Sequence, residues 1–219
     1  MLEQVHMIRV KICGVTSAVD ALFALEQGAD ALGFNFVPGT PRCLEVLTAK
    51  EIALRLPPFG TRVGIFVNEN VEKVEAISRD AGLDAVQLHG DESPEICRRL
   101  REKGFRVIRG LRVRGPETLK EADYFEECTL LLDAYCEGML GGSGKIFDWD
   151  LACEIAKNRP VILSGGLNPE NVEEAIRWVH PYGVDVSSGV EGQVPGRKVP
   201  ERIQRFIENA RAAFCNQGN

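Results

Sequence analysis

Lys11 and Cys13 stand two residues apart at the end of the first apolar run, in the tetrapeptide Lys11-Ile12-Cys13-Gly14. If this run is a β-strand, alternation places the cation and the thiol on one face, about 7 Å apart. A thiol acts as a base only in its thiolate form, and a nearby cation lowers its ordinary pKa of about 8.5. A core cysteine beside a snorkelling lysine is the alternative, because free cysteine is among the most buried residue types. The choice depends on whether other strands end in the same way.

Four further apolar runs also end in side chains that can do chemistry. These are Gln87 and His89 in the fourth run, Arg109 in the fifth, Asp133 after three leucines in the sixth, and Asp185 with Ser187 in the eighth. Buried parallel strands are otherwise almost wholly apolar, so these exceptions indicate a polar patch at one rim. Any one of them alone could be a hydrogen-bonded core group. Asp133 follows three leucines, and a leucine-rich environment disfavours the carboxylate anion.

Two turns of small residues follow the seventh and eighth runs, in residues 164–170 and 187–191. The first turn also contains Asn168 and Pro169, which predict a helix cap followed by the first helical position. Backbone N–H groups in such turns bind anions, and the loops after strands seven and eight are a recurring phosphate site in barrels. Ordinary turns are the alternative. The residues expected to bind phosphate are Gly165, Gly166, Ser188 and Gly189.

Two other loops complete the predicted site. Arg42 lies on the proline-stiffened loop 38–42 and suits a carboxylate partner, with a plain surface arginine as the alternative. The loop 138–145 is rich in glycine, including Gly142 and Gly144, and follows Asp133 closely. We interpret it as a mobile lid rather than a slack surface loop.

The elements that must position these residues alternate along the chain. Eight short apolar runs cover residues 8–12, 31–36, 62–67, 85–88, 106–111, 130–132, 161–163 and 184–186. Helix-like segments cover residues 17–27, 48–56, 71–81, 94–103, 169–179 and 200–214, with less clear ones at 116–125 and 149–157. Strands separated by helices predict βαβ units and a parallel sheet.

Eight such units in about 200 residues match the lower end of the size range of a (β/α)₈ barrel. The rival is an open doubly wound sheet, but no Gly-x-Gly-x-x-Gly follows the first run. No linker or low-complexity stretch divides the chain. We therefore predict the α/β class, with a single-domain (β/α)₈ TIM barrel over residues 1–219 in which residues 1–7 form a short N-terminal extension.

Composition and charge narrow the classes of partner. A net charge of −6 over 219 residues argues against a nucleic-acid surface, which needs clustered positive charge. No apolar run reaches the about 18 residues of a membrane span, and the first residues lack the features of a secretory signal. Seven irregularly spaced cysteines and three histidines predict neither a disulfide framework nor a metal site. We expect a reduced, cytoplasmic protein.

Eight segments, in this order, carry a resemblance to one family of enzymes. They are Lys11-Ile12-Cys13-Gly14, Ala31-Leu32-Gly33-Phe34, Thr40-Pro41-Arg42, Val86-Gln87-Leu88-His89-Gly90, Leu132-Asp133, Gly141-Gly142-Ser143-Gly144-Lys145, Gly165-Gly166-Leu167-Asn168-Pro169 and Gly183-Val184-Asp185-Val186-Ser187-Ser188-Gly189-Val190-Glu191. Over nearly the whole chain they resemble the phosphoribosylanthranilate isomerases of tryptophan biosynthesis. The resemblance implies a (β/α)₈ barrel that converts N-(5-phosphoribosyl)anthranilate to 1-(2-carboxyphenylamino)-1-deoxyribulose 5-phosphate. It also implies that this Amadori rearrangement uses neither a cofactor nor a metal.

The resemblance also implies roles for single residues. Cys13 matches the general base, Asp133 the general acid, and Arg42 a contact to the anthranilate carboxylate. The reaction fits these groups, since an acid is needed at the ring oxygen and a base must take the proton from sugar C2. We hypothesise that Lys11 contributes to lowering the pKa of the Cys13 thiol. The other substrate-site residues, expected as supporting polar groups, are Gln87, His89 and Asp185.

The chain departs from the family pattern at a few positions. Cys43 stands where the family more often has an aromatic residue, and Asn35 lies in the second run. Ser143 and Ile146 stand in the lid where threonines are commoner. These departures could alter substrate packing or lid closure, but they leave the acid and the base untouched.

Two other functions remain open at this point. One is another phosphosugar isomerase barrel, such as the related histidine-pathway Amadori isomerase. In that family, carboxylates serve as both the general acid and the general base. The thiol at the end of the first strand speaks against it. The other is a non-catalytic barrel that only binds phosphorylated ligands. In every case the expected partner is a small phosphorylated molecule, with no nucleic acid or membrane, and the chain is a monomer or a homodimer.

Overall fold

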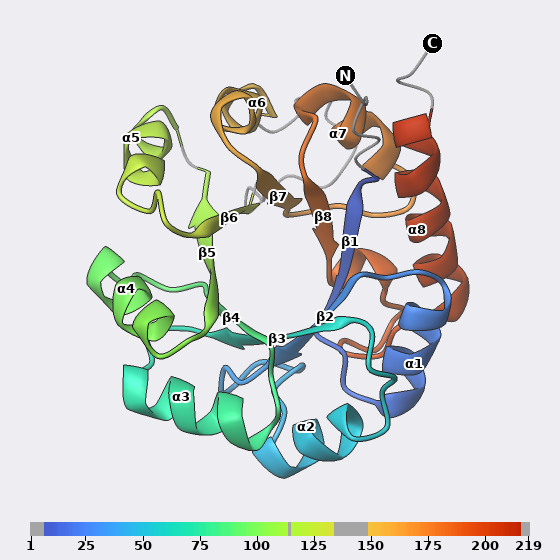
Figure 1. Ribbon diagram of the computed structural model, residues 1–219. Coiled ribbons are helices and arrows are strands. Elements are labelled where there is room, and N and C mark those ends of the chain that lie inside the picture. Colours follow the sequence, from blue (N-terminus) through green and yellow to red (C-terminus); the bar gives the residue numbers. More distant parts are fainter. Residues whose placement is uncertain (1–6, 114, 134–148, 216–219) are drawn as a thin grey trace.

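The computed structural model describes residues 7–113, 115–133 and 149–215, and its parallel strands form a closed barrel surrounded by helices (Figure 1). Each strand pairs with the next along the chain, and the last closes the ring against the first. The strands are β1 (Arg9–Cys13), β2 (Ala31–Asn35), β3 (Thr61–Phe66), β4 (Ala85–Leu88), β5 (Arg106–Arg112), β6 (Thr129–Asp133), β7 (Val161–Ser164) and β8 (Gly183–Val186). The predicted (β/α)₈ barrel is confirmed.

A helix follows each strand, including the two segments whose pattern is less clear. The helices are α1 (Ala18–Glu26), α2 (Val46–Ala53), α3 (Val71–Asp80), α4 (Pro94–Glu102), α5 (Glu117–Asp123), α6 (Trp149–Asn158), α7 (Val172–Val179) and α8 (Pro200–Cys215), with a 3₁₀ turn η1 (Ser188–Val190) after β8. Polar side chains cap two of them: Ser17 Oγ accepts the N–H of Asp20 at 3.1 Å, and Asn70 Oδ1 that of Lys73 at 2.8 Å. None of the helices in the described ranges is long and apolar enough to cross a bilayer.

The start of α7 differs from the expectation of a helix that begins at Pro169. The carboxamide oxygen of Asn168 accepts the backbone N–H groups of Glu170 and Asn171 at 2.9 and 3.1 Å, which closes a local turn. The helix therefore begins only at Val172, with Asn171 at its cap position. The hydrogen bonds expected of Asn168 as a cap are present, but they cap the turn 169–171, and the helix itself begins three residues later than predicted.

The apolar core lies between the barrel and the helices. Outward-facing strand residues, such as Ile12, Phe34 and Leu132, are fully buried there and belong to one continuous cluster with helix residues such as Phe206. Burial of such side chains stabilises the fold by roughly 1.5–3 kcal/mol each. The barrel interior is more polar, because the buried side chains of Lys11, Gln87 and Asp185 point into it. The interior therefore has room for chemistry that the outer layer lacks.

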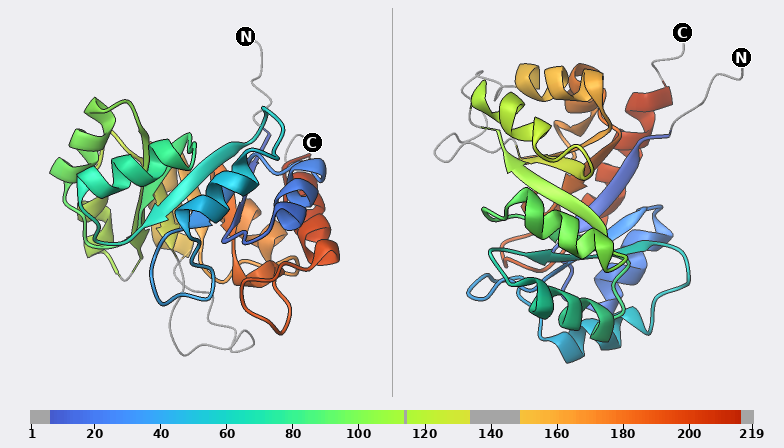
Figure 2. Two further views of the ribbon diagram at one scale, coloured as in Figure 1. Left: turned by 90° about the horizontal axis from the view of Figure 1, so that it is seen from below. Right: turned by 60° about the vertical axis from the view of Figure 1, so that its left-hand side comes forward.

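The carboxyl ends of the strands form a single rim. In the left view of Figure 2, the blue loop after β2 and the orange loop after β8 project from the same end of the barrel. An ion pair joins these two loops, from Arg42 to Glu191. This is the end at which the sequence predicts the site.

Candidate active site

Cys13 ends β1, and the neighbouring strand leaves space for its thiol. Cys13 pairs in register with Gly33 of β2. A Cβ added at Gly33 would lie 2.9 Å from the Cys13 sulfur and 3.0 Å from the Ile65 side chain. Any larger residue at position 33 would displace the thiol, so this glycine is part of the site.

A buried ion pair lies one step down the barrel from the thiol. Lys11 and Asp185 are register partners across β1 and β8, and Lys11 Nζ donates to Asp185 Oδ1 at 2.7 Å. Their side chains are only 4% and 6% exposed. The other carboxylate oxygen, Oδ2, accepts from Ser164 Oγ at 3.1 Å. Burial would lower the pKa of Lys11, but the charges of Asp185 and Cys13 raise it above its ordinary value, which keeps Lys11 cationic.

The pKa of the Cys13 thiol is raised rather than lowered. Burial is the main cause, and the Asp185 carboxylate raises it further. Lys11 and Lys198 act in the opposite direction, Lys11 both by its charge and by a hydrogen bond. Lys11 therefore acts in the predicted direction, but the predicted net lowering is wrong because burial and the carboxylate outweigh both cations. The site holds the thiol form near neutral pH and offers two ammonium groups to a thiolate once it forms.

Arg42 is fixed over the rim by a carboxylate from the β8 loop. Its Nε donates to Glu191 Oε1 at 2.7 Å and its Nη2 to Oε2 at 2.6 Å, in bidentate geometry. Lys198 Nζ donates to the same Oε1 at 2.9 Å. Burial alone would raise the pKa of Glu191, but the hydrogen bonds from Arg42 and Lys198 lower it. Arg42, predicted to bind a carboxylate, thus already binds one supplied by the chain.

Asp133, at the end of β6, contacts two side chains from the end of β4. Asp133 Oδ2 lies 3.2 Å from His89 Nε2, and His89 Nδ1 lies 3.1 Å from Gln87 Nε2. Gly110 of β5 leaves space for the imidazole, since a Cβ there would lie 2.3 Å from His89 Nδ1. With the amide nitrogen as donor, Nδ1 accepts and Nε2 carries the proton, so the imidazole donates to Asp133.

The amide of Gln87 can reverse this direction of hydrogen bonding. Its Oε1 is buried and has no hydrogen-bond partner among the described residues. With the amide turned over, Gln87 Oε1 would accept a hydrogen bond from His89 Nδ1–H. His89 Nε2 would then accept a hydrogen bond from the protonated carboxyl group of Asp133. The three side chains can therefore accommodate Asp133 as either a carboxylate or a carboxylic acid.

The two groups of residues are connected through the strands between them. Asp133 is the register partner of Ser164 across β6 and β7. Ser164 donates to Asp185, which accepts from Lys11. The rim therefore brings together six of the predicted site residues: Lys11, Arg42, Gln87, His89, Asp133 and Asp185.

Arg109 does not belong to this rim site. Its guanidinium lies outside the barrel, where Nη1 bonds to the carbonyl of Leu88 at 3.2 Å and to Glu92 Oε2 at 3.1 Å. It also stacks over the ring of Phe125, 5.0 Å from the centroid. Arg109 pairs in register with Leu88, so both side chains point outward. The expectation that strand five contributes this arginine to the site is wrong, because Arg109 lies on the outer face of β5.

The two predicted phosphate turns pack directly against each other. Gly165 and Gly166 have φ of +88° and +65°, conformations that favour glycine. A Cβ added at Gly189 would lie only 1.9 Å from the carbonyl oxygen of Leu167, so only glycine permits this close approach. Ser188 begins η1 directly beside this contact. The turns after β7 and β8 thus form one continuous backbone surface at the rim.

The predicted lid residues Gly142 and Gly144 lie outside the described residues. Among the described residues, no cluster of three or more histidine, cysteine or acidic side chains could hold a metal ion.

Three further residues shape the site without having been predicted. Glu191 accepts hydrogen bonds from both Arg42 and Lys198. Gly14, with φ +69°, lies under the stem of Arg42, where a Cβ would meet Arg42 Cδ at 2.4 Å. Gly14 and Glu191 stand in the quoted motifs, which is the only signal that could have singled them out. Lys198 lies in a loop without periodicity, so nothing in the sequence connects it to Arg42.

Comparison with families of known proteins gives one clear match. Residues 10–209 match the family described as N-(5'phosphoribosyl)anthranilate (PRA) isomerase. A relative from Trichlorobacter lovleyi, named N-(5'-phosphoribosyl)anthranilate isomerase, is 49% identical over 209 residues, which are 95% of this chain and 100% of the relative.

Solved structures agree with the sequence match. The crystal structure of phosphoribosyl anthranilate isomerase from Thermotoga maritima is similar at a TM-score of 0.88 and 47% identity, covering 94% of this chain and 100% of that one. A crystal structure of such an isomerase in complex with reduced 1-(o-carboxyphenylamino)-1-deoxyribulose 5-phosphate gives a TM-score of 0.85 at 44% identity, with the same coverage of both chains.

Proposed function

The chain belongs to the N-(5'-phosphoribosyl)anthranilate isomerase family, and from this premise we propose which of its residues carry the reaction. It is an isomerase of tryptophan biosynthesis that catalyses the Amadori rearrangement of N-(5-phosphoribosyl)anthranilate to 1-(2-carboxyphenylamino)-1-deoxyribulose 5-phosphate. The reaction is an intramolecular oxidation and reduction, in which a hydrogen moves from C2 to C1 of the sugar. It therefore needs one group that donates a proton and one that removes a proton.

We assign the proton donor to Asp133. The sugar ring opens when its ring oxygen gains a proton, which leaves a Schiff base between C1 and the anthranilate nitrogen. The observation that supports Asp133 is its place in the chain Gln87–His89–Asp133, where the turned-over amide of Gln87 lets His89 accept from a protonated Asp133. Gln87 and His89 then hold the acid in place for the ring oxygen.

We assign the proton acceptor to Cys13. Removal of the C2 proton converts the protonated Schiff base to an enolamine, which gains a proton at C1 and loses the proton of its C2 hydroxyl to give the aminoketose. The thiol must first ionise, and its raised pKa makes the thiolate a strong base. Lys11 and Lys198 stabilise the thiolate by charge, while the Asp185 carboxylate keeps Lys11 in position.

Substrate binding is assigned to Arg42 and to the two turns of glycine and serine. A guanidinium has five N–H donors, of which Arg42 gives one each from Nε and Nη2 to Glu191. The remaining donors suit the anthranilate carboxylate, and Glu191 orients the group. The phosphate fits the backbone surface that is formed by Gly165, Gly166, Ser188 and Gly189, with Gly142 and Gly144 as the proposed lid.

The state of the protein in the cell is also part of the proposal. A solved relative from Thermotoga maritima is described as a dimeric phosphoribosylanthranilate isomerase from which monomers were generated. Of the monomer and the homodimer, we propose the homodimer, in which an exposed apolar residue such as Phe59, 84% exposed, would be covered. We propose the cytoplasm as its location and a single domain over residues 1–219. Light scattering of the purified protein tests the homodimer.

The fluorescence of anthranilate tests the proposed residues. Purified protein mixed with N-(5-phosphoribosyl)anthranilate should remove the substrate fluorescence, and Cys13→Ala and Asp133→Asn proteins should do so far more slowly. Circular dichroism must show that both variants fold, and a product analogue must still bind to them. Full activity of either folded variant would overturn its assigned role.

A further inference from the structure

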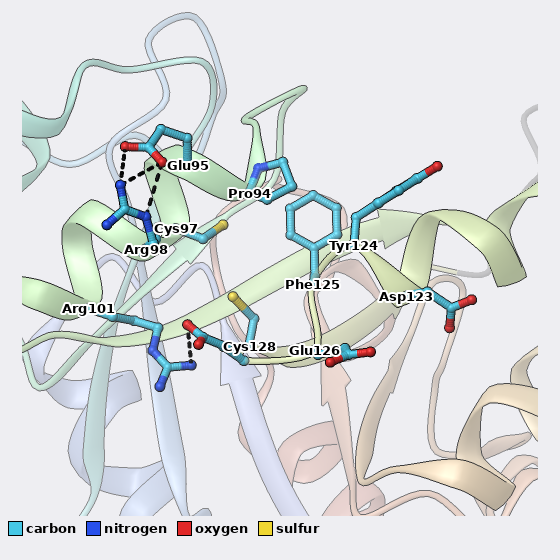
Figure 3. A pocket seen from close by; sticks show the side chains of 11 residues that line it. Pro94, Glu95, Cys97, Arg98, Arg101, Asp123, Tyr124, Phe125, Glu126 and Cys128 are labelled. Atoms are coloured by element: carbon cyan, nitrogen blue, oxygen red, sulfur yellow. Dashed lines mark hydrogen bonds and ion pairs between the residues drawn. The ribbon is translucent and has the colours of Figure 1, made fainter.

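Two buried thiols that the proposed mechanism does not use meet at a cavity on the outside of the barrel. Cys97 lies in α4, and Cys128 lies just before β6. They are 2% and 6% exposed, and Figure 3 shows their sulfur atoms pointing toward each other. The cavity has a volume of about 290 Å³ and also contains Pro94, Phe125 and Arg101 in its walls. A pair of nearly buried thiols therefore lies in the wall of a cavity that is large enough for a small molecule.

The surroundings make the two sulfur atoms unequal. The pKa of Cys97 is raised, first by its hydrogen bond with Cys128 and then by burial. The pKa of Cys128 is lowered, first by the same hydrogen bond and then by the charges of Arg101 and Arg159, although burial opposes the change. Cys97 thus keeps its proton and donates it, while Cys128 loses its proton more easily than an ordinary cysteine.

Arg159 fixes the segment that carries Cys128. Its guanidinium donates to the backbone carbonyls of Ala122 at 3.2 Å, of Phe125 at 2.9 Å and of Glu126 at 3.1 Å, and also to that of Cys128. The charge of Arg159 lowers the pKa of the Cys128 thiol, and its four backbone contacts hold the segment that carries Cys128 against the loop between α6 and β7.

We propose that Cys97 and Cys128 form a reversible dithiol–disulfide site that reacts with hydroperoxides. In the first step the Cys128 thiolate attacks the peroxide, the O–O bond breaks, and the sulfur becomes a sulfenic acid while the leaving oxygen takes a proton to give water or an alcohol. In the second step the Cys97 sulfur attacks the sulfenic sulfur, a disulfide forms, and water leaves. Two electrons pass from the two thiols to the peroxide, and a dithiol reductant reverses the reaction.

The disulfide would have a structural consequence for the rim. It would tie α4 to the start of β6, the strand that ends at Asp133. The other cysteines with described side chains lack this arrangement. Cys43 is exposed, and Cys153 is half-buried on α6.

Peptide mapping of the full-length protein tests the proposal. After a short treatment with hydrogen peroxide, blocking of remaining thiols and proteolysis without reductant, mass spectrometry should find the Cys97 and Cys128 peptides joined by a disulfide. Cys128 should be oxidised about tenfold faster than exposed Cys43, because the thiolate is the reacting form. Dithiothreitol should restore both thiols.

Single substitutions separate the two steps. Cys97→Ser should leave Cys128 as a sulfenic acid that dimedone traps, and Cys128→Ser should leave Cys97 unreactive. The matched control Cys153→Ser should form the disulfide as the unchanged protein does. Intact Cys97 and Cys128 thiols at a peroxide dose that oxidises Cys43 would overturn the proposal, and this comparison within the unchanged protein needs no variant.

Discussion

The two halves of the rim hold their functional groups in opposite ways. The charged side chains around Cys13 are paired with one another: Lys11 with Asp185, and both Arg42 and Lys198 with Glu191. Asp133 contacts the imidazole of His89 at 3.2 Å, and that imidazole contacts the amide of Gln87 at 3.1 Å. One half is an ion-pair network and the other a short hydrogen-bond relay.

This difference matches what an acid and a base need. A thiol that must lose a proton needs cations nearby, and those cations are costly to bury unless carboxylates pair with them. A carboxylic acid that must keep its proton is served better by neutral partners that can both donate and accept. The distribution of charged side chains over the rim therefore distinguishes the half that contains the base from the half that contains the acid.

Lys11→Met should produce the largest change, because it breaks the ion-pair network. It leaves the Asp185 carboxylate buried and unpaired, which should lower the free energy of unfolding by about 3–5 kcal/mol in urea titrations. The pKa of Cys13 should rise further, since Lys11 lowers it, and the rate of iodoacetamide alkylation against pH measures this. Arg9→Met is the matched control, because its pair with Asp30 is exposed and worth at most about 1 kcal/mol. Equal losses of unfolding free energy in Lys11→Met and Arg9→Met would contradict the special importance of the buried ion pair.

His89→Leu should affect the acid half without this loss of stability. We expect kcat to fall about tenfold, because Asp133 loses its relay partner, and the free energy of unfolding to change by about 1 kcal/mol or less. Gln87→Leu should act in the same direction, since Gln87 sets the imidazole tautomer. Steady-state kinetics and urea titration check both. If either variant were as unstable as Lys11→Met and kept its kcat, the proposed hydrogen-bond relay would be contradicted.

Gly189→Ala tests the phosphate surface, which belongs to neither half. The added Cβ would collide with the Leu167 carbonyl, so the two turns must separate. We expect KM to rise about fivefold, equivalent to roughly 1 kcal/mol of binding, with an unchanged pH profile. Gly192→Ala, in the same loop, is the control, because its Cβ would meet only the Val199 side chain at 3.2 Å. A change of the pH profile without a change of KM would show that the turn acts on the acid or the base instead.

The smallest effect concerns the pH dependence. Because the pKa of Cys13 is raised, kcat/KM should increase with pH through a range above that of a free cysteine, as the thiol ionises. Lys198→Met should move this increase of kcat/KM to still higher pH. The change should be smaller than in Lys11→Met, because Lys11 acts on the Cys13 thiol both by charge and by a hydrogen bond. If the increase of kcat/KM moved to lower pH in either variant, the assigned role of the two lysines would be contradicted.

Strand periodicity was sufficient to predict the barrel and most of the rim, because side chains two residues apart share a face. Lys11 with Cys13 and Gln87 with His89 follow this rule. Arg109 shows its limit: a strand of seven residues offers two faces, and the sequence does not say which one is inside. Asn168 shows another limit, because a carboxamide can close a turn or cap a helix with the same bond. Glu191 and Lys198 lie in a loop, where contacts depend on tertiary structure that no period encodes.

The assignment of the base to one half of the rim and of the acid to the other is tested most directly by a kinetic isotope effect. The substrate is deuterated at sugar C2. In Cys13→Ser, removal of this hydrogen becomes the slow step, so the account predicts a large primary isotope effect on kcat. In Asp133→Asn, ring opening precedes that removal and becomes slow, so the isotope effect should be close to one. A large effect in Asp133→Asn together with none in Cys13→Ser would contradict the assignment of the acid and the base.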